Sequence, residues 1–122
     1  MKLLTIKKIF LICNALFITC LSTQIQAQTF PNKPVKLVVG FPPGGMADIV
    51  ARELGERLSQ VWKQSVIVEN RPGASGTIAA DVVAKANPDG YSLLVILTNH
   101  VVVAAIRPKL PYDSFKDFAP VS

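Results

Sequence analysis

The stretch KLVVGFPPGGMADIVAREL, residues 36–54, joins an apolar run to an amphipathic pattern through a turn of two prolines and two glycines. The apolar run, residues 35–41, is typical of a strand buried on both faces of a parallel sheet. From Ala47 the apolar residues recur every three or four positions, which predicts a helix. The turn between them has little side chain, so a ligand could approach its backbone closely.

The same order of strand, turn and helix is repeated further along the chain. Residues 65–70 form the second predicted strand, and the glycine-rich turn RPGASG follows at residues 71–76. A second helix is predicted over residues 77–87, and it ends in the turn sequence PDG at residues 88–90. A third buried strand is predicted over residues 91–97. This β-α-β-α-β order with short connections predicts an α/β fold, with a parallel sheet and flanking helices.

The apolar positions predict which face of each helix packs against the sheet. The stripe of the first helix consists of Ala47, Val50, Leu54, Leu58 and Val61. The stripe of the second helix consists of Ile78, Val82 and Ala86. After residue 97 the pattern is ambiguous: residues 101–110 favour either a helix or a strand, and residues 113–118 predict one helical turn capped by Asp113.

The first 27 residues have the features of a secretory signal peptide. A lysine-containing start precedes an uncharged apolar core, residues 9–21, and cleavage is expected after Ala27. The apolar core is shorter than the roughly 20 residues that a membrane-spanning helix needs. Lipidation of Cys20 is the alternative, although the residues before it match a lipidation motif poorly. Export from the cytoplasm is therefore expected for residues 28–122.

Removal of the predicted signal peptide changes the composition of the chain. Both cysteines leave with it, so neither a disulfide nor a thiolate metal site is expected. Three of the 13 basic residues also leave, and the remaining ten are scattered singly among eight acidic residues. This distribution predicts no nucleic-acid-binding surface.

Both glycine-rich turns follow the carboxyl ends of predicted strands, at the edge where open α/β sheets bind ligands. Each turn leads into a helix N-terminus, where unpaired amides and the positive end of the dipole favour an anion. Tight turns without a ligand are the alternative for each loop taken alone. Asp48 is expected near the third residue of the first helix, where its carboxylate would satisfy first-turn amides. Contact between Asp48 and a ligand is the alternative.

Phosphate binding and catalysis find less support in the residues. The first turn lacks the Gly-Lys-Ser/Thr of a P-loop, and GASGTIAA resembles a dinucleotide-binding turn only faintly. His100 is the only histidine, and the sequence places no nucleophile beside it, so a packing or capping role is preferred. Binding without catalysis, metal or cofactor is therefore the preferred interpretation.

Three collinear segments, residues 30–54, 66–94 and 110–122, resemble the start of a known family. They are similar to the extracytoplasmic solute receptors of the tripartite tricarboxylate transporters, the Bug family. The resemblance implies a periplasmic binding protein in which two α/β lobes enclose a cleft. Such a protein captures a small organic carboxylate for an inner-membrane permease. The alternative hypothesis is an exported α/β enzyme whose catalytic residues lie beyond Ser122.

The resemblance also implies which residues bind the ligand. In the family, the loops corresponding to residues 43–48 and 71–77 hold the carboxylate through main-chain amides, hydroxyls and ordered water. The edge after the third strand lines the same pocket. The ligand-binding residues expected on this basis are Gly44, Gly45, Met46, Asp48, Gly73, Ala74, Gly76, Thr77, Thr98 and Asn99. Met46 stands where the family often has Ser or Thr, so an apolar wall is expected in place of a hydroxyl.

Family members are much longer than this chain. The resemblance therefore implies that residues 28–122 are the N-terminal part of the first lobe, either as a fragment of a longer gene product or as a truncated relative. In both cases apolar surface and an unpaired sheet edge would be exposed. We expect residues 28–122 alone to bind ligand poorly and to aggregate.

Overall fold

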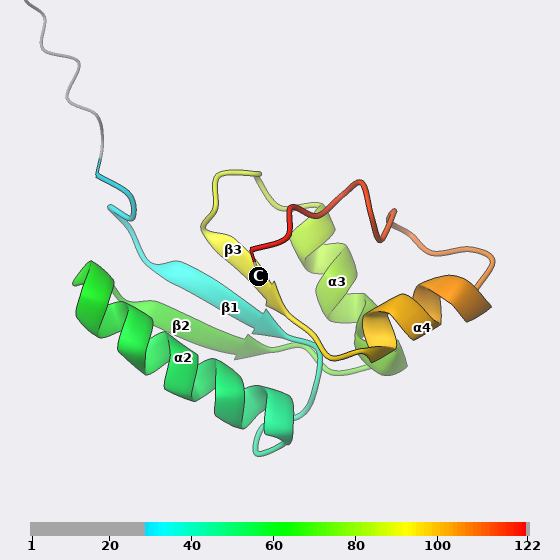
Figure 1. Ribbon diagram of the computed structural model, residues 1–122, viewed down its shortest axis with the longest axis horizontal. Helices are drawn as coiled ribbons and strands as arrows, with labels where there is room; N and C mark the ends of the chain where they lie inside the picture. The colour runs from blue at the N-terminus through cyan, green and yellow to red at the C-terminus, as the bar shows by residue number, and fades with distance from the viewer. Residues whose placement is uncertain (1–28, 122) are drawn as a thin grey trace, which may run out of the picture.

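The computed structural model describes residues 29–121, and the predicted signal peptide lies outside the described residues. The strands are β1 (Val35–Val39), β2 (Val66–Asn70) and β3 (Ser92–Val95). The helices are α2 (Met46–Trp62), the short 3-10 helix η1 (Ala74–Gly76), α3 (Thr77–Ala84) and α4 (Asn99–Ile106) (Figure 1). The predicted β-α-β-α-β order is confirmed, and the ambiguous segment after β3 is a helix.

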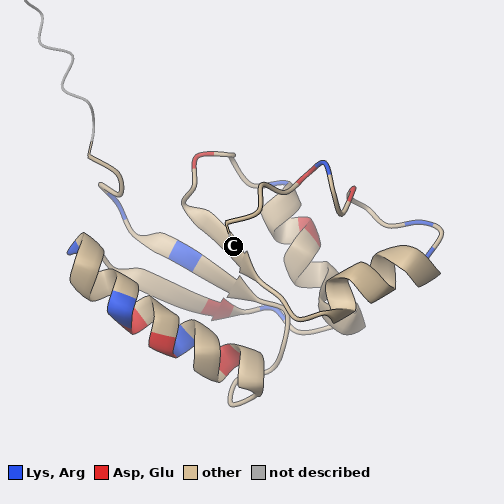
Figure 2. Cartoon of the chain, viewed as in Figure 1, with Lys and Arg blue, Asp and Glu red and all other residues tan. Residues whose placement is uncertain are grey.

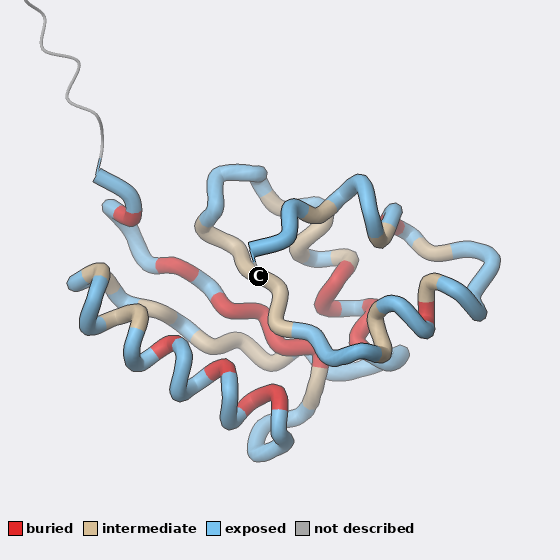
Figure 3. The backbone as a smooth tube through the Cα atoms, viewed as in Figure 1, coloured by how far each residue is buried: buried red, intermediate tan, exposed pale blue. Residues whose placement is uncertain are grey.

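The three strands form one parallel sheet in the order β2-β1-β3. The central strand β1 pairs with β2 from Val35 to Val39 and with β3 from Lys36 to Val39. Its apolar side chains are fully buried, and Figure 3 shows β1 as the most continuously buried strand. This central position explains why its sequence is apolar on both faces.

Helices α2 and α3 cover the sheet. Helix α2 packs against β1 and β2, whereas α3 packs against β1 and β3. Strand β2 pairs with one edge of β1, and β3 pairs with the opposite edge of β1. With right-handed crossovers, this order places α2 and α3 on opposite faces. The loops after β1 and β3 then diverge at the edge of the sheet, which is the topological switch point where open α/β sheets bind ligands.

The face of α2 that contacts the sheet differs from the predicted stripe. The buried positions are Ala47, Asp48, Ala51 and Gly55, whereas Val50 and Leu54 are exposed and Val61 is 75% exposed. A Cβ atom on Gly55 would lie 3.4 Å from Cγ1 of Val66, so the helix sits close to the strands. The prediction was wrong for Val50, Leu54 and Val61, whereas Leu58 is half-buried. Near its N-terminal end the helix lies too close to the sheet for large side chains, so small ones are buried there.

The same difference occurs in α3. Thr77, Ala79 and Ala80 are buried, whereas Ile78 and Val82 of the predicted stripe are exposed. The predicted third strand is also shorter and less buried than expected: β3 ends at Val95, its residues are half-buried, and Ile96 and Leu97 are exposed. Its position at the edge of this three-stranded sheet accounts for the partial burial.

The segment after α4 packs back on that helix through aromatic contacts. His100 stacks on Tyr112 with ring centroids 5.9 Å apart, and Phe118 meets both rings edge-on. The predicted turn at Asp113 is present, because its Oδ1 accepts hydrogen bonds from the amides of Phe115 and Lys116. His100 therefore has the packing role that was preferred for it. Among residues 29–121, no helix has the length and apolar character needed to cross a bilayer.

Candidate functional site

The loops that follow the three strands meet at the carboxyl edge of the sheet. A Cβ atom on Gly40, directly after β1, would lie only 2.9 Å from Cα of Gly76, so the main chains of the first two loops touch there. Asn99, the first residue of α4, donates a hydrogen bond from Nδ2 to the carbonyl oxygen of Ser75 at 2.6 Å. Gly40 was not among the predicted site residues, although its place at the end of the apolar run is a signal for close approach.

The first loop ends in a helix start with unpaired amides. Gly44 has a φ of +81°, and the first helical hydrogen bond runs from the amide of Ile49 to the carbonyl of Gly45 at 3.0 Å. The amides of Met46, Ala47 and Asp48 precede that bond, and no acceptor among the described residues pairs with them. These donors and the positive end of the α2 dipole favour a negatively charged group.

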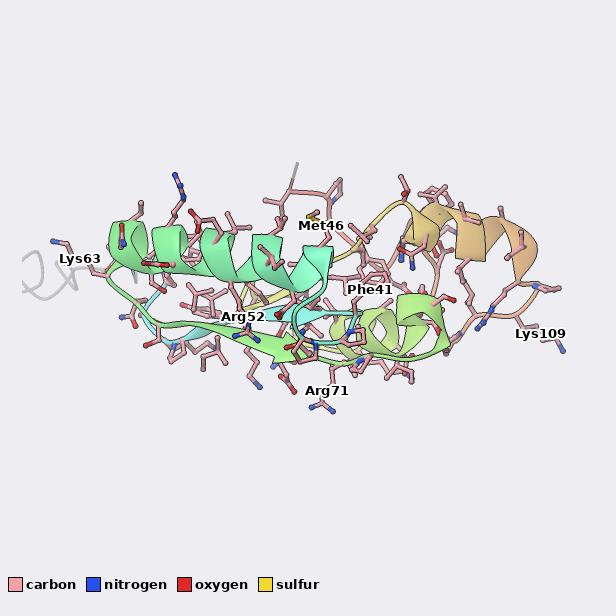
Figure 4. All side chains as sticks on the ribbon, turned by 90° about the horizontal axis from the view of Figure 1, so that it is seen from below. Phe41, Met46, Arg52, Lys63, Arg71 and Lys109 are labelled. Atoms are coloured by element: carbon pink, nitrogen blue, oxygen red, sulfur yellow. The ribbon has the colours of Figure 1, made fainter. Side chains whose placement is uncertain are left out.

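The side chains of Met46 and Asp48 differ in burial at this helix start. The Met46 side chain is exposed at the N-terminal end of α2 (Figure 4). Asp48 is only 2% exposed, and its carboxylate is directed into the protein. Its Oδ2 accepts hydrogen bonds from the amide of Gly44 at 2.8 Å and from Nε of Arg52 at 2.9 Å. Its Oδ1 accepts one from Nδ2 of Asn70 at 2.8 Å.

Asp48 is therefore the third residue of α2, as expected, but it accepts from the loop amide of Gly44 and not from the first-turn amides. The hydrogen bond from Arg52 lowers the pKa of Asp48 far below its ordinary value, and the bonds from Gly44 and Asn70 act in the same direction. The carboxylate is thus ionised throughout the neutral range, and the guanidinium of Arg52 balances its charge.

The second loop contains a left-handed turn that the sequence did not predict. Gly73, Ala74, Ser75 and Gly76 have φ angles of +129°, +48°, +59° and +84°. The left-handed conformation costs a non-glycine residue about 1–2 kcal/mol. Such backbone strain clusters at functional sites. The hydroxyl of Thr77 closes the turn by donating to the carbonyl oxygen of Ala74 at 2.9 Å.

The loop after β3 completes the site. Thr98 is exposed at the start of α4, and Asn99 links that start to the second loop through Ser75. Oδ1 of Asn99 is buried and has no hydrogen-bond partner among the described residues. The structure thus brings the three predicted loops to one edge. The amides at the start of α2 are unpaired there, whereas the hydroxyl of Thr77 and the amide nitrogen of Asn99 donate to carbonyl oxygens of the second loop.

Other parts of the described chain do not contribute to this edge. A cavity of about 780 Å³ lies between the end of α4 and residues 107–117, and none of the predicted site residues lines it. Helix α4 has no charged side chain (Figure 2). Within residues 29–121, no cluster of three or more His, Cys, Asp or Glu side chains is arranged to hold a metal ion.

Comparison with known proteins identifies the family. The sequence model of the tripartite tricarboxylate transporter family receptor, TctC, matches residues 50–122. The chain belongs to this family. The resemblance seen in the sequence is thereby confirmed, and membership favours a solute receptor over the alternative of an exported enzyme.

Relatives and solved structures agree with this assignment. A UPF0065 protein of Bordetella bronchiseptica is 51% identical over 98 residues, which are 80% of this chain and 29% of that protein. The periplasmic binding protein BugD matches with a TM-score of 0.72 and 38% identity over 75% of this chain and 31% of its own. MatC from Rhodopseudomonas palustris, solved with bound malate, matches with a TM-score of 0.70 and 44% identity over 75% of this chain and 32% of its own.

These matches confirm the predicted fold class, an α/β fold of the periplasmic-binding-protein type with a parallel sheet. The chain spans 29% and 32% of the lengths of the first two curated relatives that it matches. The described sheet and helices correspond to part of such a protein.

Proposed function

We propose that residues 28–122 are the N-terminal part of the first lobe of a periplasmic receptor that captures a small organic carboxylate. The receptor would deliver this ligand to the inner-membrane permease of a tripartite tricarboxylate-type transporter. The observation that supports this most is the start of α2, where the amides of Met46, Ala47 and Asp48 have no acceptor among the described residues. Family membership and the malate bound to MatC support the choice of a carboxylate.

The proposed binding site lies at the edge where the three loops meet. The carboxylate would accept hydrogen bonds at the start of α2, beside Gly44, Gly45 and Met46. The left-handed turn from Gly73 to Gly76, with Ala74 and Thr77, would close one side of the site. Thr98 and Asn99 would line the other side. Export is supported by the signal-peptide pattern of residues 1–27 and by the periplasmic relative BugD.

Calorimetry and thermal unfolding of the complete gene product test this function. The probes are malate, citrate, glutamate and benzoate, with dimethyl malate as a control of similar shape without the charges. We expect at least one acid to bind and the diester to fail. An acid present at about 100 times its dissociation constant would stabilise the protein by about 2.7 kcal/mol. Binding of no acid, or equal binding of the diester, would contradict the proposal.

Substitution of Met46 tests the backbone contact itself. Proline is tolerated as the first helical residue, and Gly45 before it has an extended backbone with φ −79° and ψ 168°. Met46→Pro therefore removes one amide donor while the helix is retained. Loss of a hydrogen bond to a charged group is worth about 1.5–3 kcal/mol, or roughly 10- to 100-fold in affinity. Met46→Ala, which keeps the amide, is the matched control and should bind within a few-fold of the wild type.

A further inference from the structure

Asp48 joins three separate elements at the proposed binding edge. Its carboxylate accepts hydrogen bonds from the loop after β1 through the Gly44 amide, from α2 through Arg52, and from the last residue of β2 through Asn70. All three partners are donors, and both carboxylate oxygens are used. The side chain is 97% buried, although the guanidinium of Arg52 is 56% exposed.

Asn70 closes this arrangement into a network. Its Nδ2 also donates to the carbonyl oxygen of Phe41 at 3.1 Å, in the middle of the first loop. Its Oδ1 accepts a hydrogen bond from Nη2 of Arg52 at 3.2 Å. The first loop is therefore held at two points, Phe41 and Gly44, which lie on either side of the two prolines. A loop fixed at both ends presents the following amides in one geometry.

The charges in the network suit an anion site nearby. An unpaired carboxylate in the first turn of a helix would itself occupy the positive end of the dipole and would repel a second anion. Arg52 pairs with Asp48 at 2.9 Å, so the network adds little net charge. The unpaired amides at the start of α2 therefore keep their attraction for a ligand.

We propose that Asp48, with Arg52 and Asn70, positions the amides at the start of α2 for ligand binding without contacting the ligand. This inference rests on the proposed carboxylate-binding function. Asp48 is thus a positioning residue of the site, although the family resemblance placed it among the ligand contacts. The network would hold the two glycines of this loop in the conformation that the structure shows.

The isosteric substitution Asp48→Asn distinguishes positioning from contact. An amide at this position cannot accept from all three donors, because its NH2 group would face at least one of them. The loop should then loosen, and affinity for an acid should fall. Residues that orient ligating groups at metal sites affect affinity by about 10- to 100-fold, and we expect at least tenfold here. A carboxylate that faced the anion directly would repel it, so its removal would tighten binding.

The experiment uses the complete gene product and measures two quantities. Calorimetry gives the dissociation constant for malate or for the acid that the wild type binds best. Amide hydrogen exchange at Gly44 gives the order of the loop without any ligand. The matched control is Glu53→Gln, which removes the exposed pair with Arg57 at the same spacing on the outer face of α2. We expect the control to match the wild type in both quantities.

The possible outcomes separate this inference from the proposed function. Weaker binding and faster exchange at Gly44 in Asp48→Asn alone would support the positioning role. Unchanged or tighter binding in that variant would overturn it. If the wild type binds no acid, the proposed function fails, and unchanged exchange at Gly44 in Asp48→Asn would overturn the network's role as well. If Asp48→Asn does not fold, Arg52→Lys is tested in its place. This variant keeps the positive charge at a half-exposed position but loses the hydrogen bond from Arg52 to Asn70. Unchanged affinity for the acid and unchanged exchange at Gly44 would then overturn the inference.

Discussion

Glycines at the proposed binding edge differ in how strongly each position requires glycine. Gly73 has a φ of +129°, and a Cβ atom there would lie 2.6 Å from Cδ1 of Ile78. Gly44 also has a positive φ, +81°, but no atom lies within 4 Å of its missing Cβ. Gly45 has an ordinary φ of −79° and only ordinary contact. The three positions should therefore differ in how much stability an alanine costs.

Gly73→Ala should destabilise the protein by about 1–3 kcal/mol, because a backbone at φ +129° and ψ 152° is open essentially to glycine alone, and the tip of the Ile78 side chain would also have to move. Gly44→Ala should lose less stability than Gly73→Ala, since its φ is positive but no atom lies within 4 Å of the added Cβ. Gly45→Ala should cost less than Gly73→Ala, about 0.5 kcal/mol, because Gly45 is the N-cap of α2 and alanine is less favourable than glycine there. Chemical denaturation of the three variants measures this order. Equal stability of Gly73→Ala and Gly45→Ala would contradict the described turn.

Acidification should destabilise the protein through Asp48. Its pKa is lower in the folded protein, chiefly because Arg52 donates a hydrogen bond to it, so the unfolded chain binds the proton at higher pH. The stabilisation is complete above about pH 5 and is lost as the pH falls toward the folded pKa. Asp89 and Asp113, whose pKa values are also lowered, act in the same direction. Thermal melting between about pH 7 and pH 3 should show a shallower decline in Asp48→Asn than in the wild type. Parallel declines would contradict the role of this carboxylate.

At the scale of elements, the contact between α2 and the sheet depends on small side chains. Ala47, Ala51 and Gly55 recur every fourth residue and face β1 and β2. The Gly55 position faces Leu37, Val66 and Val68, and a Cβ atom there would lie 3.4–3.6 Å from their side chains. The helix therefore has room for at most a methyl group at this point.

Gly55→Val should destabilise the protein by about 1–3 kcal/mol through overpacking. Glu56→Val is the matched control, because it places the same β-branched residue at the next, exposed position of the same helix. Gly55→Ala should be neutral or stabilising by up to about 1 kcal/mol, since helix propensity improves and the methyl group meets only ordinary van der Waals contacts. Denaturation midpoints measure all three. A Gly55→Val variant as stable as Glu56→Val would mean that α2 does not lie close to the sheet at Gly55.

The periodicity of the sequence predicted the elements well and their buried faces poorly. Strand β1 and helix α2 were predictable because a β-rich run and a spacing of three to four residues are local signals. The buried face of α2 was not predictable from hydrophobicity, because Val50 and Leu54 are larger and more apolar than Ala51 and Gly55. The distance between helix and sheet selects the small residues, and that distance is a property of the packed layers.

At the scale of the whole molecule, helices α2 and α4 expose apolar side chains, and the sheet has unpaired edges. Val50, Leu54 and Val61 are exposed on α2, and Val101, Val102 and Ile106 are exposed on α4. Strands β2 and β3 each have one unpaired edge in this three-stranded sheet. Both features favour association with other chains.

Residues 28–122 alone should therefore self-associate. Sedimentation velocity should show species larger than a monomer that grow with concentration. The double variant Val61→Lys, Ile106→Lys charges two of the most exposed apolar positions and should shift the distribution toward the monomer. The control Arg57→Lys leaves the apolar surface unchanged. A wild-type fragment that stays monomeric would contradict this expectation.

The position of the candidate site could be predicted from the sheet topology, but the contacts within the site could not. Two glycine-rich turns after parallel strands must meet at one edge, so residues 43–48 and 71–77 were predictable neighbours. The contact of Gly40 with Gly76, the left-handed turn at Ala74 and Ser75, and the bond from Asn99 to Ser75 depend on long-range packing. The role proposed for Asp48 depends on Asn70, which lies 22 residues further along the chain.

In the proposed function, backbone amides at the start of α2 hold the carboxylate of the ligand. A crystal structure of the complete gene product with its bound acid tests this most directly. We predict a carboxylate oxygen within about 3 Å of the amide nitrogen of Met46 or Ala47, with the side chain of Asp48 turned away from the acid. An acid that contacts neither the turn before α2 nor the turn from Gly73 to Gly76 would contradict the account.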